Sequence, residues 1–121
     1  MNTQELFNTV VKHLLTQNEK SIDLADNRCL YYNPVTKLKC AIGCLIAPCH
    51  YNEHFENLRF SSRPGTVIRT AVEDSIGREL LEEECYFLRS LQEIHDNHTP
   101  NDWPELLAEE AVCYSLTMPS I

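Results

Sequence analysis

Hydrophobic side chains recur with the period of an α-helix near the start of the chain. The repeat is formed by Leu6, Phe7, Val10, Val11, Leu14 and Leu15. Residues four apart lie on the same face of a helix, so this spacing predicts an amphipathic helix from about Thr3 to Gln17. Asn2 and Glu5 have the spacing of a capping box, which would start that helix.

The second half of the chain contains three further stretches of helical periodicity. The first stretch lies between Thr66, a helix-starting residue, and Gly77, a helix-ending one. The second stretch ends at residues 99–101. The third begins at Asp102, which has capping-box spacing with Glu105. The apolar positions are Val67, Ile68, Ala71, Val72 and Ile76, then Leu80, Leu81, Cys85, Leu88, Leu91, Ile94 and His95, and finally Trp103, Leu107, Ala111 and Tyr114. We therefore expect three helices after residue 65 and a frayed tail from Met118 to Ile121.

Two short runs of β-prone residues lie between the first helix and the later ones. Cys29–Tyr32 and Leu38–Ile42 flank a turn at residues 33–36. A four-residue turn would place Cys29 opposite Cys40. We expect both to stay reduced, with a strained disulfide as the less favoured alternative. The prediction is an α+β fold: a small antiparallel hairpin packed against about four helices, with no internal repeat.

The length of 121 residues fits one domain spanning residues 1–121. The chain has no uninterrupted run of about 18 apolar residues, which excludes a membrane-spanning helix. Its N-terminus has no basic segment followed by an apolar one, so it does not read as a signal peptide. These features predict a cytoplasmic protein that does not bind membranes.

The net charge of −8 arises entirely from residues 61–121, where twelve Asp and Glu oppose four Arg. Direct binding to nucleic acid is disfavoured because phosphate recognition requires a basic surface. An acidic surface instead favours a partner protein with a basic surface. The candidate partner-binding residues are Glu79, Glu82, Glu83, Glu105 and Glu109. The alternative is that these charges only confer solubility.

One segment concentrates residues that can ligate a metal. It contains Cys40, Cys44, Cys49, His50 and His54. Structural zinc sites use about four such ligands, often from two closely spaced cysteine pairs, and this chain lacks a second pair. We therefore expect no tightly bound zinc and no cofactor, and this set of five is where a metal would bind if one did.

Enzymatic activity is the less favoured class. Cys49 precedes His50 at the start of a short predicted helix, and His95 is followed by Asp96, which allows a small metal- or thiol-dependent hydrolase built around Cys49, His50, His54 and His95. No phosphate-binding glycine loop and no serine-nucleophile elbow can be formed with glycines only at 43, 65 and 77.

One set of positions along the chain carries a family resemblance: His13–Gln17, Ser21, Cys29, Tyr31, Leu38–Ile46, Leu91–Asn97 and Trp103. At these positions the chain resembles a family of small uncharacterised proteins from bacteria and their phages. The resemblance implies an α+β fold and a phage or prophage setting, without an assigned activity. Together with the charge pattern it suggests a non-enzymatic interaction protein, such as a phage-derived inhibitor or modulator of a host protein. The alternatives are the hydrolase described above and a small-ligand-binding protein with a pocket beside the hairpin.

Overall fold

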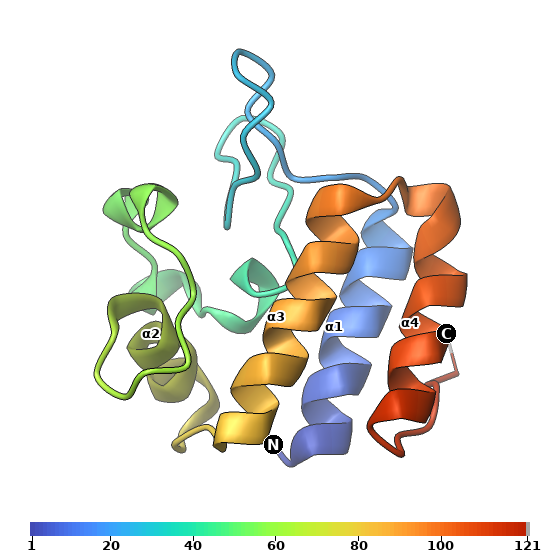
Figure 1. Cartoon of the computed structure of the whole chain (residues 1–121). Coiled ribbons are helices and arrows are strands. Elements are labelled where there is room, and N and C mark those ends of the chain that lie inside the picture. The colour runs from blue at the N-terminus through green and yellow to red at the C-terminus, as the bar shows by residue number, and fades with distance from the viewer. Residues whose placement is uncertain (121) are drawn as a thin grey trace.

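The computed structural model describes residues 1–120, and it is built from four α-helices and four short 3-10 helices (Figure 1). The α-helices are α1 (Thr3–Gln17), α2 (Val67–Ile76), α3 (Glu82–Asn97) and α4 (Trp103–Cys113), and the 3-10 helices are η1 (Gly43–Leu45), η2 (Pro48–His50), η3 (Glu53–Asn57) and η4 (Pro100–Asp102). The helices α1, α3 and α4 pack against one another, while α2 lies apart from α1 and α4, beyond α3 (Figure 1).

The predicted first helix is confirmed at both ends. The Asn2 side chain accepts a hydrogen bond from the Glu5 N–H at 2.8 Å, and the Asn2 N–H donates to the Glu5 carboxylate at 3.0 Å. Asn18 ends the helix in the left-handed conformation with φ of 51°. Short-range sequence signals therefore define this helix completely.

The later helices follow their apolar stripes, but one predicted cap is wrong. Thr66 and Gly77 flank α2 as expected. The capping box predicted at Asp102 does not form, because Asp102 already has helical backbone angles in η4 and its side chain makes no capping bond. Spacing alone does not distinguish the N-cap of α4 from the last residue of a preceding 3-10 turn.

The apolar faces of the four α-helices form one core together with residues 41–46 around η1. Phe7, Phe87 and Trp103 are fully buried, with the Phe7 and Phe87 ring centroids 5.7 Å apart. The tail is more ordered than predicted, because Met118 packs against this core and the Thr117 N–H donates to the Gln4 side chain at 2.9 Å. Ile121 lies outside the described residues.

The predicted α+β fold is wrong. No strand forms among the described residues, and only two isolated antiparallel bridges occur, between Ile22 and Cys29 and between Tyr32 and Lys39. The predicted turn register is wrong as well, because Tyr32 pairs with Lys39 and Cys29 pairs with Ile22 instead of Cys40. The protein is helical, with residues 18–42 as an irregular but hydrogen-bonded segment.

Side chains from the helices explain why the β-prone residues form no sheet. The Tyr31 and Tyr32 N–H groups donate to the Glu56 carboxylate at 2.8 and 3.1 Å. The Lys39 N–H donates to Gln17 at 3.0 Å, and the Ile42 N–H donates to Gln92 at 2.9 Å. A buried backbone donor needs a partner, but that partner need not be another strand. Because side chains accept the hydrogen bonds of these backbone N–H groups, neither isolated bridge extends into a β-ladder.

The segment between α1 and η1 contains two successive loops, residues 21–30 and residues 31–40, which share two backbone hydrogen bonds at equivalent positions. In the first loop, the Asp23 N–H donates to Arg28 and the Asn27 N–H donates to Asp23. In the second loop, the Asn33 N–H donates to Leu38 and the Lys37 N–H donates to Asn33. The two loops therefore repeat part of one backbone conformation, although their sequences do not repeat.

This repeat is invisible in the sequence because few positions determine it. Asp23 and Asn33 each accept a hydrogen bond at 2.9 Å from the N–H two residues later, which is an Asx turn. Asn27 and Lys37 both have positive φ, 59° and 68°. Only the Asx residue is a recognisable signal, since a lysine in the left-handed region is not expected from its type.

A half-buried ion pair between Arg78 and Glu84 joins the start of α3 to the N-terminus. The Arg78 guanidinium donates to both Glu84 oxygens at 2.9 and 2.7 Å, and the Thr3 hydroxyl donates to Glu84 at 2.8 Å. Burial alone would raise the pKa of Glu84, but the hydrogen bonds from Arg78, Leu81 and Thr3 outweigh burial and lower that pKa to about 2. The folded state therefore favours the ionised carboxylate.

We predict that Glu84 contributes to acid sensitivity. Its pKa in the fold lies below the ordinary value of 4.5, so its stabilisation is present above pH 4.5 and is lost as the pH falls toward 2. The loss should be about 2 kcal/mol, less than the full shift implies because solvent reaches Arg78. Urea unfolding between pH 2 and 6 should show a shallower pH dependence for Glu84→Gln than for the natural chain. Equal slopes for the two proteins would contradict this role.

Candidate functional site

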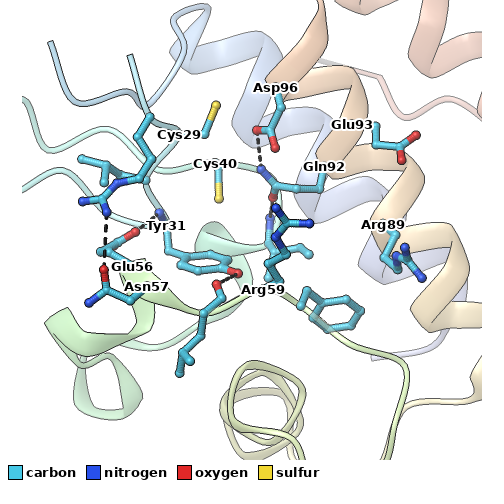
Figure 2. Close-up of a pocket in the computed structure, with 15 residues that line it drawn as sticks. Cys29, Tyr31, Cys40, Glu56, Asn57, Arg59, Arg89, Gln92, Glu93 and Asp96 are labelled. Carbon is cyan, nitrogen blue, oxygen red and sulfur yellow. Dashed lines mark hydrogen bonds between the residues drawn. The ribbon is translucent and has the colours of Figure 1, made fainter. Parts of the chain in front are cut away.

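A cavity lies between the junction of the two loops, the segment after η3, and α3 (Figure 2). Its volume is about 620 Å³, and it is lined by Arg28, Cys29, Leu30, Tyr31, Cys40, Ile42, Glu56, Asn57, Leu58, Arg59, Phe60, Arg89, Gln92, Glu93 and Asp96. Three segments that are distant in sequence meet here because Glu56 holds the Tyr31–Tyr32 backbone and Gln92 holds Ile42. The same bonds that replace a sheet therefore build this cavity.

The cavity carries arginines without acidic partners. Within residues 1–120, neither Arg59 nor Arg89 forms an ion pair, and Arg28 only donates to the Asn57 side chain at 3.4 Å. All three are exposed at its edge. Figure 2 shows Arg59 extending toward the α3 side of the cavity and Arg89 on α3 itself.

Two of the three carboxylates that line the cavity already accept hydrogen bonds from other groups of the protein. Glu56 accepts the Tyr31 and Tyr32 N–H bonds and a 2.6 Å bond from the Tyr51 hydroxyl. Asp96 accepts bonds from His95 at 2.8 Å and from Gln92 at 2.7 Å. Glu93 is exposed and accepts no hydrogen bond among the described residues.

Cys29 and Cys40 are free thiols that both line the cavity. Burial and the neighbouring Asp96 carboxylate raise the pKa of Cys29 to about 12, and burial raises the pKa of Cys40 well above its ordinary range. Both thiols are therefore protonated at neutral pH. Since the thiolate is the nucleophilic form, neither is activated for covalent catalysis.

Cys29, His95 and Asp96 form a compact cluster in which one atom from each lies within 4.8 Å of the others. The hydrogen bonds define the protonation of this cluster. His95 Nε2 accepts from the Ser21 N–H at 3.0 Å, so the proton of the neutral ring is on Nδ1 and is donated to Asp96 at 2.8 Å. His95 is fully buried and stacks on Trp103 with ring centroids 5.4 Å apart.

This arrangement fits a structural network better than a catalytic or metal centre. A catalytic histidine would accept the thiol proton, but here both ring nitrogens of His95 are engaged elsewhere. A metal on Nδ1 would require the ring proton on Nε2, where it would face the Ser21 N–H. The cluster therefore anchors the first loop to the end of α3.

The structure does not bring together the predicted ligand set of Cys40, Cys44, Cys49, His50 and His54. Cys40 is buried, and the Cys44 thiol donates to the Ala41 carbonyl at 3.0 Å. Cys49, His50 and His54 are exposed on η2 and η3, and no side-chain hydrogen bond joins Cys49 to His50 in residues 1–120. His95 lies in the separate cluster with Cys29 and Asp96, so the hydrolase grouping is not assembled.

The predicted partner-binding glutamates are exposed but separated. Glu79, Glu82 and Glu83 lie at the start of α3, whereas Glu105 lies in the first turn of α4, beside the end of α3. The length of α3 separates these groups by about 20 Å, more than twice the Debye length at physiological ionic strength. They form two surfaces instead of one.

Sequence reasoning missed Arg59, Arg89 and Gln92 as cavity residues. Arg59 lies in a segment without periodicity, and Arg89 and Gln92 lie on the polar side of α3, where polar residues are ordinary. No local signal could have identified them, because the cavity is formed by contacts between distant segments.

Within residues 1–120, no helix is long and apolar enough to cross a membrane. A scan of protein-family models, a search of curated proteins and a search of solved structures found no match to the chain. The resemblance to small bacterial and phage proteins therefore remains a prediction, and function must be argued from the surfaces and the cavity themselves.

Proposed function

We propose that this protein is a non-enzymatic, cytoplasmic interaction protein that binds a partner with a basic surface, as a phage-derived inhibitor or modulator of a host protein would. The observation that carries the proposal is the set of unpaired charges. Within residues 1–120, none of Glu79, Glu82, Glu83, Glu105 and Glu109 forms an ion pair. Carboxylates that are exposed and unpaired attract approaching cationic groups and contribute little to the stability of the fold.

The start of α3 is the better of the two acidic surfaces. Leu81 is 61% exposed and Tyr86 is 48% exposed there, close in sequence to the glutamates. The Tyr86 hydroxyl donates to Glu82 at 2.9 Å, which orients the ring. Protein interfaces combine exposed aromatic anchors with a charged rim. We call Glu79, Leu81, Glu82, Glu83 and Tyr86 the α3 patch.

The test compares charge reversals that change net charge equally. Glu82→Lys with Glu83→Lys should slow association with a basic partner by about tenfold or more, since rim charges act mainly on the association rate. Glu105→Lys with Glu109→Lys should have a smaller effect and serves as the matched control. Capture from host lysate followed by binding kinetics at low and physiological salt provides the measurement. If the partner associates equally fast with both variants and the natural chain at every salt concentration, the proposal is wrong.

A further inference from the structure

The cavity between the loops and α3 is lined by three arginines whose guanidinium groups form no ion pair among the described residues, in an otherwise acidic chain. Arg28, Arg59 and Arg89 have no ion-pair partner in residues 1–120, whereas Glu56 and Asp96 accept internal hydrogen bonds. Only Glu93 remains as a free carboxylate at the edge. Guanidinium groups bind oxyanions through paired N–H donors, so arginines without an ion-pair partner at the edge of a cavity favour a ligand that carries an oxyanion.

The cavity is also larger than an inorganic anion alone would fill, and part of its wall is apolar. Its volume of about 620 Å³ falls in the range of small-molecule sites. Leu30, Ile42 and Phe60 contribute apolar walls, and the protonated Cys29 and Cys40 thiols add weakly polar surface. An organic body could fill this space while its charged group remained near the arginines.

We propose that this cavity binds a small organic anion, with a carboxylate or phosphate group at Arg59 and Arg89 and an apolar body between the loop junction and α3. Arg59 comes from the segment after η3 and Arg89 from α3, so the two guanidiniums approach the ligand from different walls (Figure 2). Glu93, one helical turn from Arg89, weakens the attraction for the anion. The cavity shares no lining residue with the α3 patch, although Arg89 lies one helical turn from Tyr86.

The proposal predicts opposite effects for three neutralising variants. Arg59→Gln and Arg89→Gln should each weaken anion binding by about tenfold, because a charge-assisted bond is lost. Glu93→Gln should strengthen binding by about twofold, because a like charge is removed. Arg63→Gln is the matched control, since Arg63 is exposed and does not line the cavity. All four positions are exposed, so the fold should be retained.

The probes are benzoate, adenosine monophosphate and inorganic phosphate, with benzamide and adenosine as neutral counterparts. Binding is followed by calorimetry and by amide chemical shifts. We expect an organic anion to bind more tightly than inorganic phosphate and its neutral counterpart, with shifts at residues 28–31, 56–60 and 89–96. A preference for benzoate identifies a carboxylate ligand, and a preference for adenosine monophosphate identifies a phosphate ligand.

Three results would overturn the proposal: no binding of any anion up to about 10 mM, equal binding of the neutral counterparts, or affinities unchanged by the Arg59 and Arg89 substitutions. Shifts confined to other surfaces would also exclude this cavity. None of these results depends on whether a protein partner binds the α3 patch.

Discussion

Gly43→Ala should lower the free energy of unfolding by about 3 kcal/mol or more. A Cβ atom at this position would lie 1.9 Å from the Tyr31 carbonyl oxygen and 2.7 Å from its carbonyl carbon. Both obstacles are backbone atoms, so no side-chain rotation relieves the overlap. The Tyr31 backbone is itself held by Glu56, which limits its movement. The fold must therefore separate η1 from the loop junction or unfold.

Gly65→Ala is a control that separates the effect of a steric clash of the added Cβ from the effect of an unfavourable backbone conformation. Gly65 has φ of 81°, and a Cβ there would meet nothing within 4 Å. Its substitution should cost only about 1 kcal/mol, from left-handed strain. Urea denaturation monitored by circular dichroism measures both variants. If Gly43→Ala is no more destabilising than Gly65→Ala, the close approach of Tyr31 to Gly43 is not part of the fold in solution.

His95→Ala should lower the free energy of unfolding by about 3 to 4 kcal/mol. The imidazole is fully buried against Trp103, so its removal leaves a void in the core. It also leaves the Ser21 N–H without its acceptor and Asp96 without its Nδ1–H donor. Each loss adds to the cost because a buried polar group without a partner is unfavourable.

The loss at His95 should be concentrated in the first loop. Hydrogen exchange of the Ser21 amide should become faster than the global destabilisation explains, since that amide loses its only acceptor among the described residues. His98→Ala is the matched control, because His98 is exposed three residues later. Equal destabilisation by the two substitutions would show that His95 does not anchor the loop.

Prediction from the sequence succeeded where local rules act. The Asn2–Glu5 capping box fixed the start of α1, and the Gly77 signal fixed the end of α2. Helical periodicity placed Leu91 and Trp103 in the core because a long amphipathic helix has few alternative ways to bury its apolar face. The charge asymmetry identified five glutamates that are indeed exposed.

Prediction failed between residues 18 and 42, where the hydrogen-bond partners come from distant positions. β-prone residues at 29–32 and 38–42 indicate a preference for extended backbone but not which acceptor each N–H will find. The acceptors are Gln17, Glu56, Gln92 and His95, up to 74 residues away from the donor. Turn counting gave the wrong register because it assumed one hairpin, whereas the chain forms two loops of the same design.

The sequence by itself therefore determined the helices, their buried faces and the acidic second half, since each depends on neighbours within a few turns. The tertiary structure decided that the middle segment is not a sheet, that His95, Asp96 and Cys29 gather in one structural network, and that Arg59 and Arg89 line the same cavity. Those outcomes depend on which distant side chain reaches a given backbone donor, and no periodicity encodes that choice.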